Sequence, residues 1–259
     1  MSLQRDLHGI HAIWLREFKI FQRERSRVVS ALASPLLWLF LLGTGLRSTA
    51  STPEGVDYYA YIFPGVALMS VLFQGMFFGL YIVWDRKIDV LKAVLVSPVS
   101  RPAVFFGKVL GGCTDVTIQA AILLLIGLAV IPDGHEEMVH YLALYPVAVA
   151  LVVLIAVGLV SVGLTIGSFF ESLEGFQVFI TFLAFPMFFL SGALYSLEGL
   201  PPWFSQAVTL NPMTYAVDAL RWLLVPAAGR LNPAVDLAVI SGFGMVMVLV
   251  GSWSFRRMR

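Results

Sequence analysis

Long apolar stretches alternate with short polar segments along the chain, and six of these stretches are long enough to cross a membrane. A helix that spans a hydrocarbon core of about 30 Å needs roughly 20 mostly apolar residues, because each residue rises about 1.5 Å. The stretches that meet this requirement are residues 28–46, 61–84, 109–131, 141–169, 176–195 and 235–255. The pattern therefore predicts an all-α polytopic membrane protein in which residues 1–259 form a single transmembrane domain.

The first 27 residues have a different, amphipathic pattern. Apolar residues recur there at three- and four-residue spacing, namely Leu7, Ile10, Trp14, Phe18 and Phe21. Polar and basic residues fall largely on the other side, which predicts a helix over 1–27 that lies in the plane of the inner headgroups. Such a helix either serves only as an anchor or uses its polar face, including Arg16 and Glu17, to contact a cytoplasmic partner.

The segment 85–107, between the second and third apolar stretches, is neither a span nor an ordinary loop. Its first part mixes charged and apolar residues in a helical pattern, and Pro98 and Pro102 then predict a break and a restart of the helix. The sequence thus predicts a rigid cytoplasmic elbow, either a plain connector with solvated charges or a short helix that a soluble motor can push. The short acidic connection 171–175 offers Glu171 and Glu174 to the same partner.

Residues 196–234 predict a pair of short helices on the outer side. Asn211 is a typical N-cap residue, Pro212 suits the first helical position, and the helix expected over 212–224 is too short to span. Three of its polar residues form a stripe opposite its apolar face. The pair either re-enters the membrane as a gate or lies on the surface as a lid. The residues expected to shape this gate are Pro202, Trp203, Asn211, Pro212, Thr214, Asp218 and Arg221.

Composition and charge narrow the class of protein further. Apolar residues make up 59% of the chain and charged residues 13%, against roughly 45–50% and about 25% in typical soluble domains. These values exclude a soluble enzyme, a disordered chain and a nucleic-acid-binding protein. Of the 17 Lys and Arg residues, 14 lie in segments that six spans with a cytoplasmic N-terminus place inside. The positive-inside rule therefore predicts that both termini are cytoplasmic.

Motifs for catalysis or metal binding are not found in the sequence. Lys108 follows a glycine as in a phosphate-binding loop, but Pro102 stands where the loop's first glycine should be. His135 and His140 superficially resemble a zinc-protease motif, but they are five residues apart and would not share a helix face; we expect an outer loop there. The sequence predicts no metal site, no cofactor bound by this chain and no ATPase activity.

Two weaker signals lie inside the predicted spans. Asp115 and Gln119 are one helical turn apart in the third span, and a carboxylate there must face protein or a wet cavity. The pair can be a functional intramembrane site or a structural contact between helices, and the sequence leaves both open. Glycines at 75 and 79, and again at 163 and 167, have a spacing that permits close helix contact.

The combination of leader, elbow, six spans and outer hairpin resembles the permease subunits of type-2 ABC exporters, which include bacterial drug, polysaccharide and nodulation-factor export permeases. The resemblance covers nearly the whole chain and rests on the residues 95–101, 107–112, 189–195, 200–203, 211–215 and 218–221. These strings are specific for the family and do not identify a substrate.

The resemblance implies a permease subunit driven by two copies of a separate ABC ATPase, which would hold ATP and Mg. It implies a homodimer or a pairing with another permease in the bacterial inner (cytoplasmic) membrane, surrounded by membrane lipid and without a nucleic-acid partner. Spans one and five would border the dimer interface. The residues implied in ATPase coupling are Val96, Ser97, Pro98, Val99, Ser100, Arg101, Pro102, Glu17, Glu171 and Glu174.

The sequence thus predicts the outward transport of an amphipathic or lipid-like substrate, such as a drug, a lipid or a glycan. The alternative is a polytopic membrane enzyme or an assembly factor that acts on lipid or peptide. An enzyme would require a nucleophile and a base at one membrane depth, and all four histidines lie outside the predicted spans or at their edges.

Overall fold

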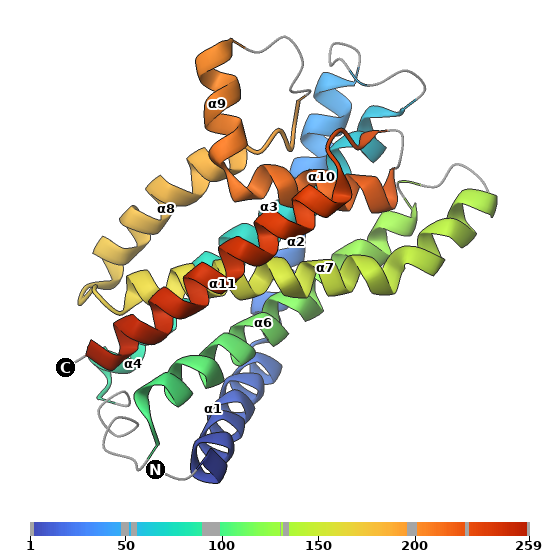
Figure 1. The fold of residues 1–259 in the computed structure, drawn as a ribbon. Helices are drawn as coiled ribbons and strands as arrows, with labels where there is room; N and C mark the ends of the chain where they lie inside the picture. The colour runs from blue at the N-terminus through green and yellow to red at the C-terminus, as the bar shows by residue number, and fades with distance from the viewer. Residues whose placement is uncertain are drawn as a thin grey trace.

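The computed structural model describes residues 3–47, 52, 56–89, 99–129, 131, 135–195, 201–225 and 228–257. Every regular element within these residues is a helix, which confirms the all-α prediction (Figure 1). The elements are α1 (Leu3–Arg23), α2 (Arg25–Leu46), α3 (Tyr58–Phe77), α4 (Leu80–Lys87), α6 (Arg101–Ile126), the 3₁₀ turn η1 (Gly127–Ala129), α7 (His135–Gly167), α8 (Leu173–Phe189), α9 (Pro202–Leu210), α10 (Pro212–Leu224) and α11 (Pro233–Arg257).

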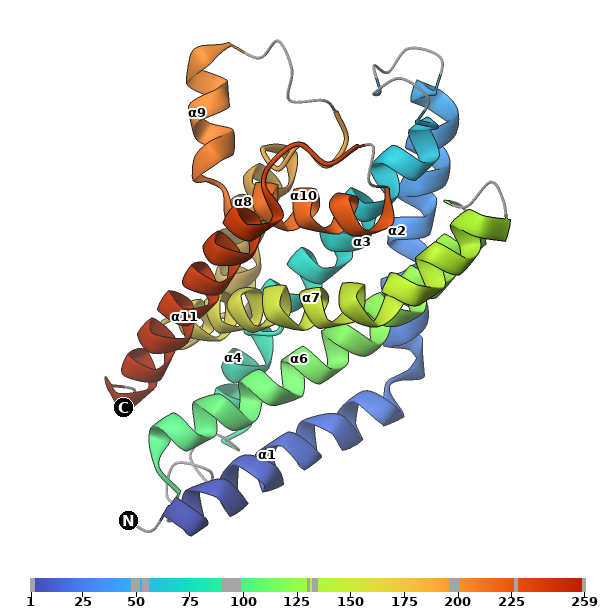
Figure 2. The ribbon, with the colours of Figure 1, turned by 45° about the vertical axis from the view of Figure 1, so that its right-hand side comes forward.

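Five segments of the described chain are helical, long and apolar enough to cross a membrane. They are Val28–Leu46, Tyr58–Lys87, Arg101–Ala129, Met138–Gly167 and Pro233–Arg257. The fifth apolar stretch forms α8, an apolar helix of 17 residues. The chain runs back and forth, so that both termini and the α7–α8 connection lie toward one end of the bundle and α9 and α10 toward the other (Figures 1 and 2).

Several boundaries differ from the sequence prediction: the leader helix expected over 1–27 ends at Arg23, and the fifth span expected over 176–195 is helical over Leu173–Phe189. Residues 101–107, expected in the elbow, form the first two turns of α6, because the Ser100 hydroxyl caps the helix by accepting the Ala103 N–H at 3.4 Å. The outer loop expected at His135–His140 is wrong, since these residues begin α7. No glycine or proline lies between His135 and Tyr145, so nothing in the sequence ends the helix there.

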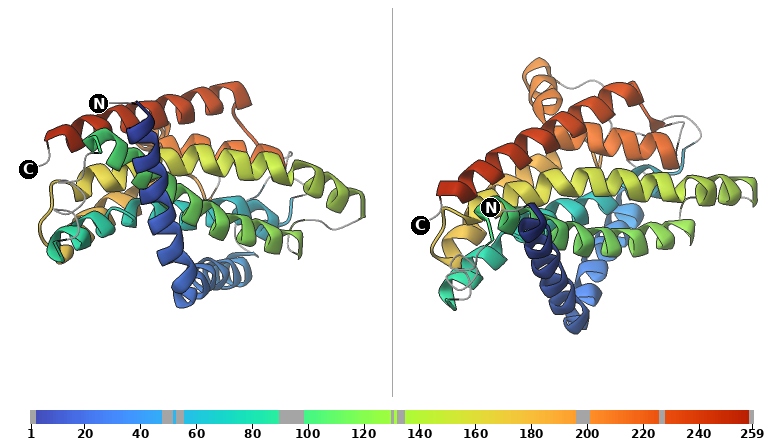
Figure 3. Two further views of the ribbon diagram at one scale, coloured as in Figure 1. Left: turned by 90° about the horizontal axis from the view of Figure 1, so that it is seen from below. Right: turned by 60° about the horizontal axis from the view of Figure 1, so that its bottom comes forward.

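The centre of the fold is the crossing of α3 and α4 over α7. A Cβ atom added to Gly79 would overlap the carbonyl of Gly163, and one added to Gly167 would overlap the carbonyl of Gly79. The two glycine pairs noted in the sequence therefore pack against each other, backbone to backbone. Beneath α6, α1 crosses the bundle at an angle, and α2 stands at its edge (Figure 3).

This crossing predicts opposite effects for two glycine substitutions. Gly163→Ala should destabilise the protein by about 1–3 kcal/mol, because the methyl group meets backbone atoms that cannot move aside. Gly242→Ala in α11 adds its methyl group where nothing lies within 4 Å, and alanine favours the helix, so its stability should be unchanged or slightly higher. Thermal unfolding of both variants in one detergent checks the contrast; equal melting temperatures would contradict the close crossing.

Candidate functional site

The end of the bundle that holds both termini is the end that the sequence predicts to face the cytoplasm, and we call it the inner end. It is built on a close contact between α1 and α6 (Figure 2). A Cβ atom added to Gly107 would lie 2.8 Å from Ile13 Cβ, and one added to Gly111 would lie 2.6 Å from Glu17 Cβ. These distances are too short for two side chains, so glycine at both positions lets the helices approach this closely. The amphipathic leader therefore packs directly on α6.

Four charged side chains meet where α1, α4 and α6 come together, and we call Arg16, Glu17, Asp85 and Lys108 the inner charge cluster. Lys108 Nζ lies 2.9 Å from Glu17 Oε1 and 2.7 Å from Asp85 Oδ2. Arg16 Nη2 lies 2.6 Å from Asp85 Oδ1. Lys108 is 1% exposed, Asp85 4% and Glu17 5%. Two acids and two bases compensate each other, as buried charges require.

The inner charge cluster corrects two expectations. The polar face of the leader was expected to present Glu17 to a partner, but its carboxylate is buried against Lys108. Asp85 was expected among the charges of the elbow, but it is a buried residue of α4. Sequence reasoning missed Lys108 as a buried charge: it compared the residue with a phosphate-binding loop and counted it among the basic residues of the inner segments. A lone lysine next to a long apolar run was the available signal, since such a group needs a buried partner.

The described end of the elbow is fastened to the start of α1. Asp6 accepts two hydrogen bonds from Ser100, one from its N–H at 2.9 Å and one from its hydroxyl at 2.8 Å. These bonds lower the pKa of Asp6 below its ordinary value. Val99 packs on Gly9, where an added Cβ atom would lie 2.6 Å from a Val99 methyl group.

The other residues implied in coupling lie at the same end of the bundle. Arg101 and Pro102 form the first turn of α6 and are half-buried. Val96, Ser97 and Pro98 lie outside the described residues. Glu171 and Glu174 are exposed at the α7–α8 connection. Arg86, at the end of α4, donates to the carbonyls of Phe170 and Ser168 at 2.7 and 2.8 Å, which holds this connection against α4.

The hairpin that the sequence predicts on the outer side is formed by α9 and α10, and we keep the name outer hairpin for it. Pro202 and Trp203 begin α9 and are exposed, whereas α10 packs between α3, α7 and α11 (Figure 2). Asn211 caps α10, with Pro212 in the first turn: its Oδ1 accepts the Met213 N–H at 3.0 Å, as the sequence predicts. Its amide also donates to the carbonyl of Met187 in α8 at 2.6 Å, so the cap joins the hairpin to α8.

The polar stripe of α10 is buried, which corrects the expectation of one polar and one apolar face. Thr214 donates to the Val208 carbonyl at 2.8 Å. Asp218 accepts the backbone N–H groups of Arg230 at 3.0 Å and Leu231 at 2.8 Å. These hydrogen bonds hold neighbouring segments of backbone and satisfy the polar groups of the stripe. The polar face of α10 can therefore be buried as well as its apolar face.

Arg221 is the centre of the outer end and is only 3% exposed. It donates to the carbonyls of Gly192 and Ala193, both at 2.9 Å, and to the carbonyl of Tyr61 at 3.2 Å. Its guanidinium group lies 3.9 Å from the centre of the Tyr61 ring. One side chain therefore joins α10 to α3 and to the turn after α8.

Asp115 and Gln119, the polar pair inside the third span, are both buried. The Gln119 amide donates to Asp115 Oδ1, so the two side chains satisfy part of each other's polarity within α6. Among the described residues, no group of three or more His, Cys, Asp or Glu side chains could hold a metal ion.

Comparison with known proteins assigns this arrangement to a class. The family model for ABC-2 type transporters matches residues 8–225, which contain the inner charge cluster and the outer hairpin. The chain belongs to the ABC-2 type transporter family. With its apolar helices, it is a multi-pass membrane protein.

Curated relatives match over nearly the full length. Nodulation protein J of Rhizobium leguminosarum bv. viciae is 24% identical over 251 residues, covering 95% of this chain and 93% of the relative. The inner membrane transport permease YadH of Escherichia coli strain K12 is 27% identical over 249 residues, covering 93% of this chain and 90% of the relative. The fold and the family thus agree with the resemblance inferred from the sequence.

Proposed function

We propose that the chain is the membrane-spanning permease subunit of an ATP-driven exporter that moves an amphipathic or lipid-like substrate, such as a drug, a lipid or a glycan, outward. A separate ABC ATPase, in two copies, binds ATP and Mg and hydrolyses ATP, while this chain carries out no chemistry. The family and the relatives named as a transport permease and a nodulation protein support this assignment.

The observation that carries the proposal is the connection of the elbow to the rest of the inner end. A force applied to residues 96–102 reaches α1 through the two bonds between Asp6 and Ser100. The inner charge cluster carries the same displacement to α4, because Lys108 of α6 bonds both Glu17 of α1 and Asp85 of α4. The elbow, α1, α4 and α6 therefore move as one unit when the ATPase closes.

The proposed arrangement in the membrane has six spans with both termini in the cytoplasm. The α8 helix is the fifth span, and the distribution of basic residues supports the orientation. Two such subunits, identical or paired with another permease, enclose the pathway in the bacterial inner membrane. Glu171 and Glu174 provide a second contact for the ATPase, and both are exposed for it.

Asp6→Ala should break the connection between the elbow and α1, and so slow ATP hydrolysis, without unfolding the protein. The substitution removes both bonds from Ser100 while leaving the inner charge cluster intact. We expect the purified complex of this chain with its ABC ATPase to hydrolyse ATP roughly tenfold more slowly, because a tenfold loss of rate corresponds to only about 1.4 kcal/mol of lost interaction. Gln4→Ala, an exposed neighbour in the same helical turn, is the matched control and should keep the activity.

Three results bear on the proposal. Stable co-purification with the ATPase, and hydrolysis that falls in Asp6→Ala but not in Gln4→Ala, would support it. Equal hydrolysis in both variants would remove the coupling role of the Asp6–Ser100 contact. Full turnover of a lipid or peptide substrate by the chain alone in vesicles would overturn the assignment and favour a membrane enzyme.

A further inference from the structure

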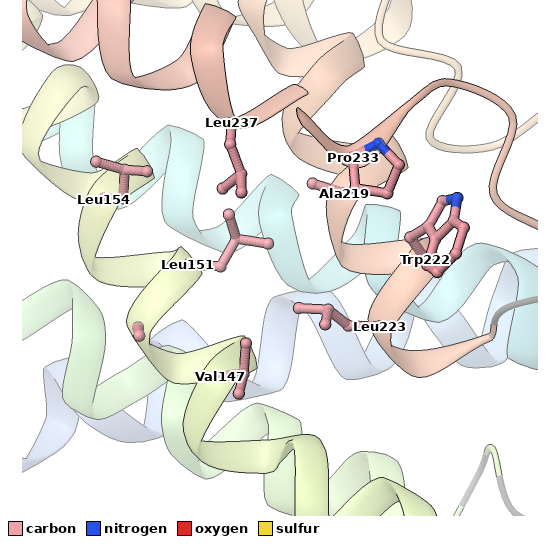
Figure 4. Close-up of a pocket in the computed structure, with 9 residues that line it drawn as sticks. Val147, Leu151, Leu154, Ala219, Trp222, Leu223, Pro233 and Leu237 are labelled. Carbon is pink, nitrogen blue, oxygen red and sulfur yellow. The ribbon is translucent and has the colours of Figure 1, made fainter. Parts of the chain in front are cut away.

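An apolar groove of about 310 Å³ opens between α7, α10 and α11. It is lined by Val147, Ala150, Leu151, Leu154, Ala219, Trp222, Leu223, Pro233 and Leu237, most of which Figure 4 labels. Leu151 and Ala219 are buried and form its floor, whereas Val147, Trp222 and Leu237 are partly exposed and form its rim. The groove is therefore open to whatever surrounds the helices.

In the orientation that the proposed function gives, the groove begins at the outer end of α11 and extends to about the middle of the membrane-spanning segment of α7. On α7 it extends from Val147 to Leu154, about 14 to 24 Å along the helix from Met138, where the apolar segment begins. On α11 it uses the first two turns, from Pro233 to Leu237. The surrounding solvent at this depth is the acyl chains of the outer leaflet.

The volume of the groove limits which molecules can occupy it. A helix with side chains is about 10 Å wide, so a helix segment that filled the groove would be only about 4 Å long, less than one turn. The groove therefore has room for side chains of a second copy but not for a whole helix. One flexible apolar chain can fill it, because it is thin and bends to fit the floor formed by Leu151 and Ala219.

A basic residue, Arg230, precedes the lining residue Pro233 by three positions. Asp218 fixes the segment that leads to Pro233 by accepting the backbone N–H groups of Arg230 and Leu231. Arg230 is exposed on this segment, and the ring of Trp222 packs against Gly229 beside it. A tryptophan and an arginine at one level are typical of the headgroup region, where arginine attracts lipid phosphate.

We propose that the groove between α7, α10 and α11 binds one phospholipid of the outer leaflet, with an acyl chain on Leu151 and Ala219 and its phosphate at Arg230. Inside the bilayer, lipid tails and leucine side chains are equally apolar, so the hydrophobic effect does not favour this site over the surrounding lipid. The fit of the acyl chain to the shape of the groove is what retains the lipid. The bound lipid fills the space between the outer hairpin and α11 and supports the position of α10.

The test compares two exposed alanines of α7 in the full chain, purified without its ATPase in mild detergent containing palmitoyl-oleoyl phosphatidylglycerol. Ala150→Phe places a ring in the groove, whereas Ala143→Phe places the same ring two turns earlier, outside the lining residues. Native mass spectrometry then counts the lipid molecules retained by each chain. We expect Ala150→Phe to retain roughly tenfold less lipid and Ala143→Phe to match the unmodified chain.

Two further variants locate the lipid. Arg230→Gln should lower retention of phosphatidylglycerol without blocking the groove, and Trp222→Phe should remove part of the fluorescence quenching caused by a phosphatidylcholine brominated in its tail.

Equal lipid retention in Ala150→Phe and Ala143→Phe would overturn the proposal. So would a loss of dimer, without loss of lipid, in Ala150→Phe, which would assign the groove to a second copy. These measurements need no ATPase, so their failure is distinct from a failure of the proposed export function.

Discussion

Lys108→Met is expected to destabilise the protein by about 3–5 kcal/mol, because it leaves two buried carboxylates without their shared cation. Glu17 and Asp85 both lie within 3 Å of Lys108 Nζ and are almost fully buried. The methionine has nearly the length of lysine, so the loss comes from charge and not from an empty space. A shift of the thermal unfolding midpoint in detergent measures the effect.

The matched control for this substitution is Lys19→Met, which removes an exposed lysine from α1 and should change stability by less than about 1 kcal/mol. A triple variant, Lys108→Met with Glu17→Gln and Asp85→Asn, removes the charges from both sides of the contact. It should recover much of the lost stability, because a neutral buried set has a far smaller desolvation cost. Equal destabilisation in the single and triple variants would show that packing, and not charge, holds the inner end together.

The inner charge cluster also explains what the sequence could and could not predict there. The spacing of apolar residues predicts α1, and the apolar runs predict α6 and the span that contains α4, since periodicity and length are local properties. The pairing of Lys108 with Glu17 joins residues 91 positions apart, and no local pattern contains that information. For this reason Glu17 was expected on the surface, although its helix was identified.

At the outer end, too, the sequence predicts the local structure but not the contacts between distant residues. The N-cap at Asn211 and the helix after it follow from local residue types, and both appear as predicted. The polar stripe of Thr214, Asp218 and Arg221 was also visible in the sequence, but its orientation was not. Its bonds reach backbone carbonyls and N–H groups, which every residue carries, so the sequence does not mark the partners.

Arg221→Leu should destabilise the outer end by about 3 kcal/mol or more, because three backbone carbonyls lose a buried donor. Two of them, Gly192 and Ala193, belong to the turn after α8, where Gly192 has a φ of 68° that other residues rarely adopt. The third belongs to Tyr61, whose ring also loses the guanidinium above it. The thermal midpoint and the rate of proteolysis near residue 192 measure the loss.

Arg221→Lys separates charge from geometry in the same site. Lysine keeps the positive charge, but its single nitrogen cannot replace a guanidinium that reaches Tyr61 with Nε and both Gly192 and Ala193 with Nη2. We therefore expect it to recover less than half of the stability lost in Arg221→Leu. Arg47→Leu is the matched control, since Arg47 pairs with Asp57 at the surface of the protein and its loss should cost less than about 1 kcal/mol. If Arg221→Lys were as stable as the unmodified chain, the turn after α8 would be held by charge alone, and the fork of hydrogen bonds would not be what fixes α10 against α3.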